Sequence, residues 1–309
     1  MKSIIRTVAL LALVSAGVSC QNKRLDDIAT PPDLTRADVN VRINWTAGQH
    51  PDTVDGMRID IFALDGTPDY GKADVAYNGG AVKLSKGSTY LTYAYSYIGN
   101  NVQERNESDR NLIEAISAPL VRATYARAFP DEPTISGIIG SMYVGENPSY
   151  TVQDTSDPQY IDIYPQDVVK TYTFEIRNVQ GVEFISATRG GISGMSASYF
   201  LATQSLSTSP STLLFDATAN PSQNTITGSF RTFGRLNATN NFTIEILYPS
   251  STNGIMQRTW DVTGQIDNNT NYHIIIDGTG VVVPDEGGGT TSVWDVNLND
   301  WNSTTVPLN

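Results

Sequence analysis

The chain has 309 residues, of which 39% are apolar, and its 32 acidic side chains outnumber 20 basic ones to give a formal net charge of −12. This acidity disfavours nucleic acid binding, which requires clustered lysine and arginine. A single cysteine excludes an intramolecular disulfide, and two scattered histidines supply no usual zinc site. Stability must therefore come from burial and from the pairing of strands.

The amino terminus has the pattern of a bacterial export signal. Residues 1–6 are short and basic, and residues 7–16 form an apolar stretch too short to span a bilayer. We predict a signal peptide over residues 1–19 and a lipid on Cys20, the first residue after the cut. Gly17 departs from the usual pattern, which has Leu, Val or Ile at that place. Ordinary cleavage after Ala16, which would leave Cys20 as a free thiol, remains the alternative.

The first half of the chain alternates apolar and polar residues, as strands do. Residues 20–36 are polar and contain prolines, which predicts a tether between lipid and fold. Strands with a period of two are expected over 39–45, 57–61, 81–84, 88–98, 138–150 and 160–163. A helix is expected only over Glu107–Ile116. Prolines near residue 165 indicate a boundary, so the first domain is predicted over 37–165.

The second half, 166–309, repeats this organisation. A long strand over 171–177 is expected to form a hairpin with 182–188 across the turn Asn178–Gly181. Further strands are expected over 196–202, 213–217, 225–233, 242–248, 256–262 and 272–276. A glycine hinge at 287–289 precedes a last alternating strand that contains Trp294, Val296 and Leu298. Many short strands and almost no helix predict an all-β chain built from sandwiches.

Catalytic patterns are absent from the sequence. Neither His50 nor His273 accompanies the glycine-flanked elbow of a serine hydrolase, and Ser193 resembles that elbow only loosely. The acidic turns lack the spacing of a calcium loop, and no pair of carboxylates is marked out for glycoside hydrolysis. We therefore predict that the chain is not an enzyme and requires neither a cofactor nor a metal.

Several segments in this order resemble one family. They are the lipidation signal, Val39–Trp45, Gly56–Phe62, Lys86–Tyr90 with its tyrosine-rich strand, Gly191–Met195 and the Trp294 to Trp301 end. Together they resemble the fimbrillin-associated anchor lipoproteins of Bacteroidales. The resemblance implies two tandem transthyretin-like β-sandwich domains and attachment to the outer membrane through lipid on Cys20. It also implies a role as anchor or minor subunit of a fimbria, joined to pilin subunits by β-strand addition.

Two alternatives stay open at this point. The segment with Trp294, Val296 and Leu298 is either a strand donated to a partner or, as its residues favour, a last strand folded back on its own sheet. The function is either the fimbrial one or that of a glycan-binding surface lipoprotein in a polysaccharide-uptake system, which would display exposed tryptophan and tyrosine as a platform. Cleavage at Arg24 or Arg36, as in pilins, is not expected, because an anchor keeps its lipidated end.

Overall fold

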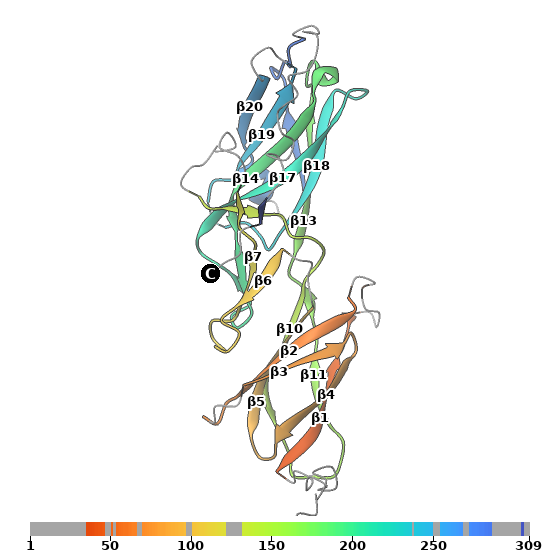
Figure 1. The fold of residues 1–309 in the computed structure, drawn as a ribbon, viewed down its shortest axis with the longest axis vertical. Coiled ribbons are helices and arrows are strands. Elements are labelled where there is room, and N and C mark those ends of the chain that lie inside the picture. The colour runs from red at the N-terminus through yellow and green to blue at the C-terminus, as the bar shows by residue number, and fades with distance from the viewer. Residues whose placement is uncertain are drawn as a thin grey trace, which may run out of the picture.

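The structure is a computed structural model that describes residues 35–46, 51, 54–66, 70–96, 101–121, 132–236, 238–249, 254–267, 272–285 and 304–305. Strands make up almost all of its regular structure. The helices among these residues are the α-helix α2 (Thr263–Asp267) and the 3-10 helix η4 (Val182–Phe184). The chain forms two curled β-sheet bodies, arranged end to end along the long axis of the molecule (Figure 1). The predicted all-β chain with two tandem β-sandwiches is confirmed.

The N-terminal body is an eight-stranded sheet in the order β11-β1-β4-β3-β2-β5-β10-β12. Its alternating apolar side chains, such as Val39, Val41 and Ile59, form a buried core inside the curled sheet. Trp45 is half-buried against that core and donates from Nε1 to the Tyr77 carbonyl at 2.8 Å. The strands are β1 (Arg36–Ile43), β2 (Gly56–Ala63), β3 (Tyr70–Ala76), β4 (Gly79–Ser85), β5 (Thr89–Ser96), β10 (Tyr143–Thr151), β11 (Gln159–Ile163) and β12 (Gln166–Asp167).

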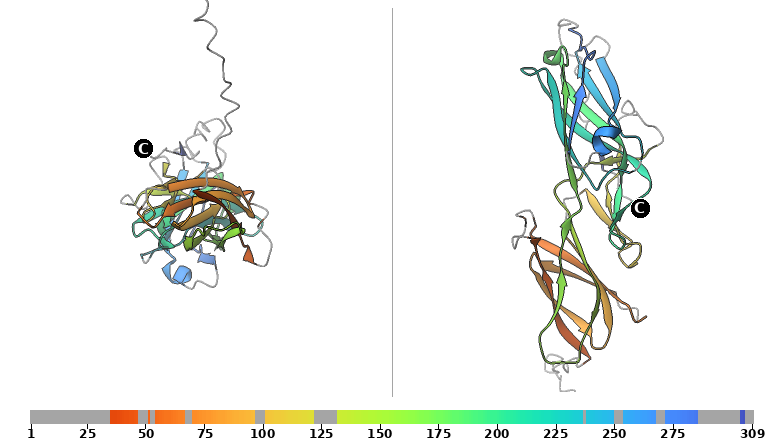
Figure 2. Two further views of the ribbon diagram at one scale, coloured as in Figure 1. Left: turned by 90° about the horizontal axis from the view of Figure 1, so that it is seen from below. Right: turned by 180° about the vertical axis from the view of Figure 1, so that it is seen from behind.

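The C-terminal body is built on a sheet in the order β20-β19-β14-β17-β18-β13-β21. Four aromatic rings, those of Phe174, Phe215, Phe230 and Phe242, meet at centroid distances of 4.9–5.2 Å and fill its core. Figure 2 shows α2, in blue, against this body from behind. The strands are β13 (Lys170–Arg177), β14 (Ala187–Ser196), β17 (Pro210–Asn220), β18 (Thr225–Thr232), β19 (Asn241–Tyr248), β20 (Gly254–Asp261) and β21 (His273–Asp277).

Strands between residues 102 and 136 pair with the C-terminal half of the chain. β7 (Glu114–Ser117) lies between β6 (Val102–Arg105) and β15 (Ser198–Phe200), which also pairs with β16 (Ser205–Leu206). β9 (Thr134–Ser136) runs parallel to β17. A third apolar cluster, with Tyr95, Ile113, Met142 and Phe233, joins side chains of both bodies. The domain limits 1–19, 20–36, 37–165 and 166–309 stay a prediction. The pairing described here shows in addition that the two halves of the chain exchange strands.

The prediction of a helix over Glu107–Ile116 is wrong. The Asp109 carbonyl accepts the N–H of Ile113 at 3.0 Å and closes a turn. After that turn Ile113, Ala115 and Ser117 are buried at every second position, which is the period of a strand. Pairing with β6 and β15 on both sides thus overrides a weak helical spacing.

The prediction of a hairpin across Asn178–Gly181 is also wrong. β13 pairs antiparallel with β18 and parallel with β21, whereas β14 pairs with β17 and β19. The segment after the turn forms η4 instead of a strand. The glycine-rich run lies inside β14, where a Cβ on Gly190 would stand 2.4 Å from the Phe215 ring. Glycine at that position is what lets the core ring approach the backbone.

Candidate functional site

Ser193 and His273, two of the residues considered above for catalysis, make structural contacts. The buried hydroxyl of Ser193 donates to the Thr239 carbonyl at 3.0 Å and accepts the N–H of Asn241 at 2.9 Å. Nδ1 of His273 lies 2.7 Å from the hydroxyl of Thr173, across the β13–β21 pair. Within the described ranges no three His, Cys, Asp or Glu side chains gather as a metal site would need. The same ranges contain no helix long and apolar enough to cross a membrane.

One edge of the C-terminal sheet is closed by a side chain. Among the described strands, β21 pairs with β13 alone. On the other side the carboxamide of Gln265, from α2, donates to the Ile275 carbonyl and accepts the Ile275 N–H, both at 2.8 Å. A primary amide presents the same donor and acceptor as a peptide group. Gln265 therefore occupies the position at which a further strand would begin to pair.

The opposite edge, formed by β20, meets no strand in the part of the chain that the structure describes. Its eight residues pair with β19 in one uninterrupted antiparallel register. In that register the Val262 N–H donates to the Asn240 carbonyl at 2.9 Å, so the even-numbered residues bond to β19. The peptide groups that face outward are therefore those of Ile255, Gln257, Thr259 and Asp261.

The side chains of β20 give this edge an apolar and a polar component. Met256 and Trp260 are half-buried against the C-terminal core, and Arg258 is exposed between them. The Arg258 guanidinium donates from Nη1 to the Gln257 carbonyl at 2.8 Å, one of the outward-facing groups. A strand added here would cover Met256 and Trp260 and replace that contact of Arg258. An unpaired edge of this length is a template for pairing with another chain.

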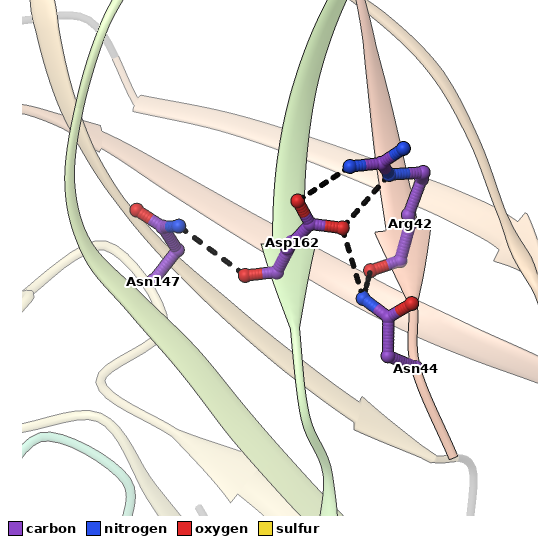
Figure 3. A network of polar contacts seen from close by, with 4 residues as sticks. All are labelled: Arg42, Asn44, Asn147 and Asp162. Atoms are coloured by element: carbon purple, nitrogen blue, oxygen red, sulfur yellow. Dashed lines mark hydrogen bonds and ion pairs between the residues drawn. The ribbon is translucent and has the colours of Figure 1, made fainter.

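A cluster of polar contacts on the N-terminal body joins the parallel strands β1 and β11 (Figure 3). Arg42 holds Asp162 with two bonds, Nε to Oδ1 at 2.8 Å and Nη2 to Oδ2 at 2.6 Å, and Asn44 donates to the same carboxylate at 2.9 Å. The Asp162 carbonyl accepts from Asn147 of β10 at 3.2 Å. The Arg42 guanidinium carbon lies 4.2 Å from the centre of the Tyr160 ring. The bonds from Arg42 lower the pKa of Asp162, and the same contact raises the pKa of Arg42.

The site residues predicted from the sequence lie outside the described residues, namely Cys20, Trp294, Val296 and Leu298, as does His50. Their roles stay predictions. After Asp285 the structure describes only β22 (Thr304–Thr305), which pairs antiparallel with β8 (Leu120–Val121). At that point the carboxyl-terminal segment pairs with its own chain.

Solved structures with a related fold come from Bacteroidales. A candidate adhesin from Bacteroides ovatus is 19% identical, with a TM-score of 0.63 over 80% of this chain and 90% of that one. A second candidate adhesin from that species is 9% identical, with a TM-score of 0.50 over 75% and 78%. The fimbrial anchor protein Mfa2 from Porphyromonas gingivalis is 13% identical, with a TM-score of 0.49 over 76% and 87%. These neighbours confirm the resemblance inferred from the sequence. Because the sequence identities are low, what the neighbours share with this chain is the fold.

Sequence comparison gives a family but no curated relative. No curated protein matches the chain. The model of a family described as "Domain of unknown function (DUF5119)" matches residues 19–216, which is more than half of the 309 residues. That match includes the N-terminal body and the first strands of the C-terminal one. The chain therefore belongs to the DUF5119 family.

Proposed function

We propose that this chain is a non-enzymatic surface lipoprotein that anchors, or forms a minor subunit of, a fimbria-like filament. The observation that carries the proposal is the open edge of β20, eight residues long and unpaired among the described strands. An extended segment of a pilin subunit would add to this edge, with backbone hydrogen bonds supplying affinity and alternate side chains supplying specificity. The fold shared with a candidate adhesin supports a role at the cell surface.

Attachment to the outer membrane is assigned to lipid on Cys20. Two or three acyl chains hold a protein on a membrane where one chain does not. We expect Cys20→Ala to release the protein from the membrane fraction or to leave its signal uncut. A processed Cys20→Ala chain that stays in the membrane fraction would exclude lipid anchoring.

The chain could also give a strand to a partner. For that role the proposed donor strand is the carboxyl-terminal segment with Trp294, Val296 and Leu298. A carboxylate at the middle position would have to be desolvated in the partner's groove, which costs on the order of several kcal/mol. Val296→Asp is therefore expected to weaken association with a co-expressed pilin at an unchanged melting temperature. A fall in melting temperature alone would indicate that the segment completes its own sheet.

The decisive experiment compares two substitutions at one outward-facing position of β20. Gln257→Pro removes the outward N–H, which a strand tolerates only at such an edge, whereas Gln257→Ala retains it. We expect a co-expressed fimbrillin-like pilin from the same bacterium to be retained by the wild type and by Gln257→Ala, and lost by Gln257→Pro, at similar melting temperatures. Retention by Gln257→Pro would exclude the β20 edge. Absence of retention by the wild type would exclude the filament role.

A further inference from the structure

Two exposed tyrosines lie on the outward face of β11 and its end. Tyr160 is 41% exposed and Tyr164 is 65% exposed, while Ile161 and Ile163 between them are buried. Asp162 shares the outward face with both tyrosines, because side chains alternate along an extended strand. We propose that this face, with Arg42 of β1, binds a neutral oligosaccharide, for which Tyr164 and the side of the Tyr160 ring that Arg42 does not cover provide stacking surfaces and Arg42 provides hydrogen bonds.

Arg42 is held in place before any ligand arrives. Its Nε and Nη2 are bonded to Asp162, and its guanidinium lies on the Tyr160 ring at 4.2 Å. A guanidinium has five N–H donors, and the side chain of Arg42 is 49% exposed, so donors that Asp162 does not engage face solvent. Because the rotamer is already fixed, little conformational entropy remains to be lost when a ligand accepts these bonds.

The charges of the cluster select an uncharged ligand. Asp162 neutralises Arg42, and its carboxylate accepts from both Arg42 and Asn44, which leaves it a poor partner for a cation. The net charge of −12 repels anions at long range. A sugar ring fits what remains, since its C–H face packs on an aromatic ring and its hydroxyl oxygens accept from a guanidinium. The two tyrosines, four residues apart on an extended backbone, suit an oligosaccharide rather than a single sugar.

Substitutions of Tyr164 distinguish an effect on ligand binding from an effect on the stability of the fold. Arg42 and Asp162 also fasten β11 to β1, so replacing either one changes the sheet as well as the surface. Toward the described residues, Tyr164 makes no hydrogen bond and no ring contact, and it lies near enough to Arg42 to contribute to the raised pKa of that side chain. Its removal therefore takes away a stacking surface and leaves the ion pair intact.

The test is affinity electrophoresis of the full mature chain in gels that contain a neutral β-glucan, α-mannan, xylan or galactan, with polygalacturonate as the acidic comparison. We expect at least one neutral polysaccharide to retard the wild type. Tyr164→Ala should weaken that binding about tenfold, the effect of losing one well-packed aromatic contact, and Tyr164→Phe should retain it within about threefold. Ile139→Ala is the matched control, because Ile139 is 64% exposed elsewhere on the surface.

Three results would overturn the proposal. They are the absence of retardation by any of the neutral polysaccharides, retardation by polygalacturonate alone, and an equal effect of Tyr164→Ala and Ile139→Ala. Melting temperatures are expected to be the same for all Tyr164 variants, and a fall in Tyr164→Ala alone would assign the residue to the fold. Pilin retention at the β20 edge is measured on the same variants, so that failure here and failure of the filament role are distinguished.

Discussion

The two outer strands of the C-terminal sheet, β20 and β21, differ in what their outward peptide groups meet. In β21, with five residues, the central outward group of Ile275 is bonded on both atoms by Gln265. In β20, with eight residues, the outward groups meet no other strand among the described residues. Exposed edges promote unwanted pairing and are usually blunted. Among the described residues the shorter edge is therefore closed by a side chain and the longer one meets no strand, so the strand addition proposed above would use β20.

The largest expected effect comes from removing the side chain that closes β21. Gln265→Ala deletes two hydrogen bonds, each worth about 1 kcal/mol, so the free energy of unfolding should fall by about 1–2 kcal/mol. The freed edge adds a second site for strand pairing, so the variant should self-associate more strongly than the wild type at the same concentration. Denaturant unfolding and light scattering after size exclusion measure the two effects. Gln257→Ala removes the same carboxamide from β20 and should change neither, and a Gln265→Ala variant that self-associates no more than the wild type would show that Gln265 does not protect the edge.

A charge on β21 should return self-association to the wild-type level without restoring the two hydrogen bonds of Gln265. Ile275 is 41% exposed, so a lysine there remains in solvent in the monomer. In a pair of β21 edges, two such lysines would lie close together and repel each other. The double variant Gln265→Ala, Ile275→Lys should therefore match the wild type in light scattering, with the unfolding free energy still lowered. Continued self-association of the double variant would place the contact elsewhere on the molecule.

Replacing Arg258 tests whether its side chain protects the β20 edge against pairing with another strand. Its guanidinium bonds to only one outward carbonyl, that of Gln257, and the side chain is exposed. We expect Arg258→Ala to change the free energy of unfolding by less than about 0.5 kcal/mol, as surface substitutions usually do, and to leave self-association at the wild-type level. Self-association as strong as that of Gln265→Ala would make the two edges equivalent and remove the contrast.

The smallest effect concerns the aspartates that end the two edge strands. Hydrogen bonds from Thr263 lower the pKa of Asp261, and bonds from Thr279 and then Asn178 lower the pKa of Asp277. Because the folded pKa lies below the unfolded one, each carboxylate stabilises the fold above about pH 4, and this contribution is lost as the pH falls through the folded pKa. Carboxyl carbon shifts in an NMR titration should give both pKa values below that of a model aspartate. A value at or above it for Asp277 would contradict the bonding at the end of β21.

The strands could be predicted from the sequence wherever one face is buried. Alternation over 39–45, 57–61 and 171–177 matches β1, β2 and β13 closely. The helix at 107–116 and the hairpin at 178–181 failed because each of these segments has a partner far away in the chain, at residues 198–200 and 225–232. Local spacing carries no information about such partners.

The candidate sites depend on the same long-range order. An edge strand is defined by what does not lie beside it, and the spacing of residues within β20 does not show which strands are its neighbours. Gln265 and Ile275 are ten residues apart and meet only because α2 lies against β21. Arg42 and Asp162 are 120 residues apart and face each other through the register of β1 and β11. The alternation of tyrosine and aspartate at 160, 162 and 164 was the one local signal of that surface.

The exchange of strands between the two bodies bears on how the molecule carries mechanical load. The chain leaves the N-terminal body after β5, pairs with C-terminal strands through β7 and β9, returns for β10 and β11, and crosses again into β13. Three covalent connections therefore link the bodies, where a simple tandem arrangement has one. A pull that draws the two bodies apart is divided among these three connections, so any extension of the molecule is resisted by several backbone segments in parallel.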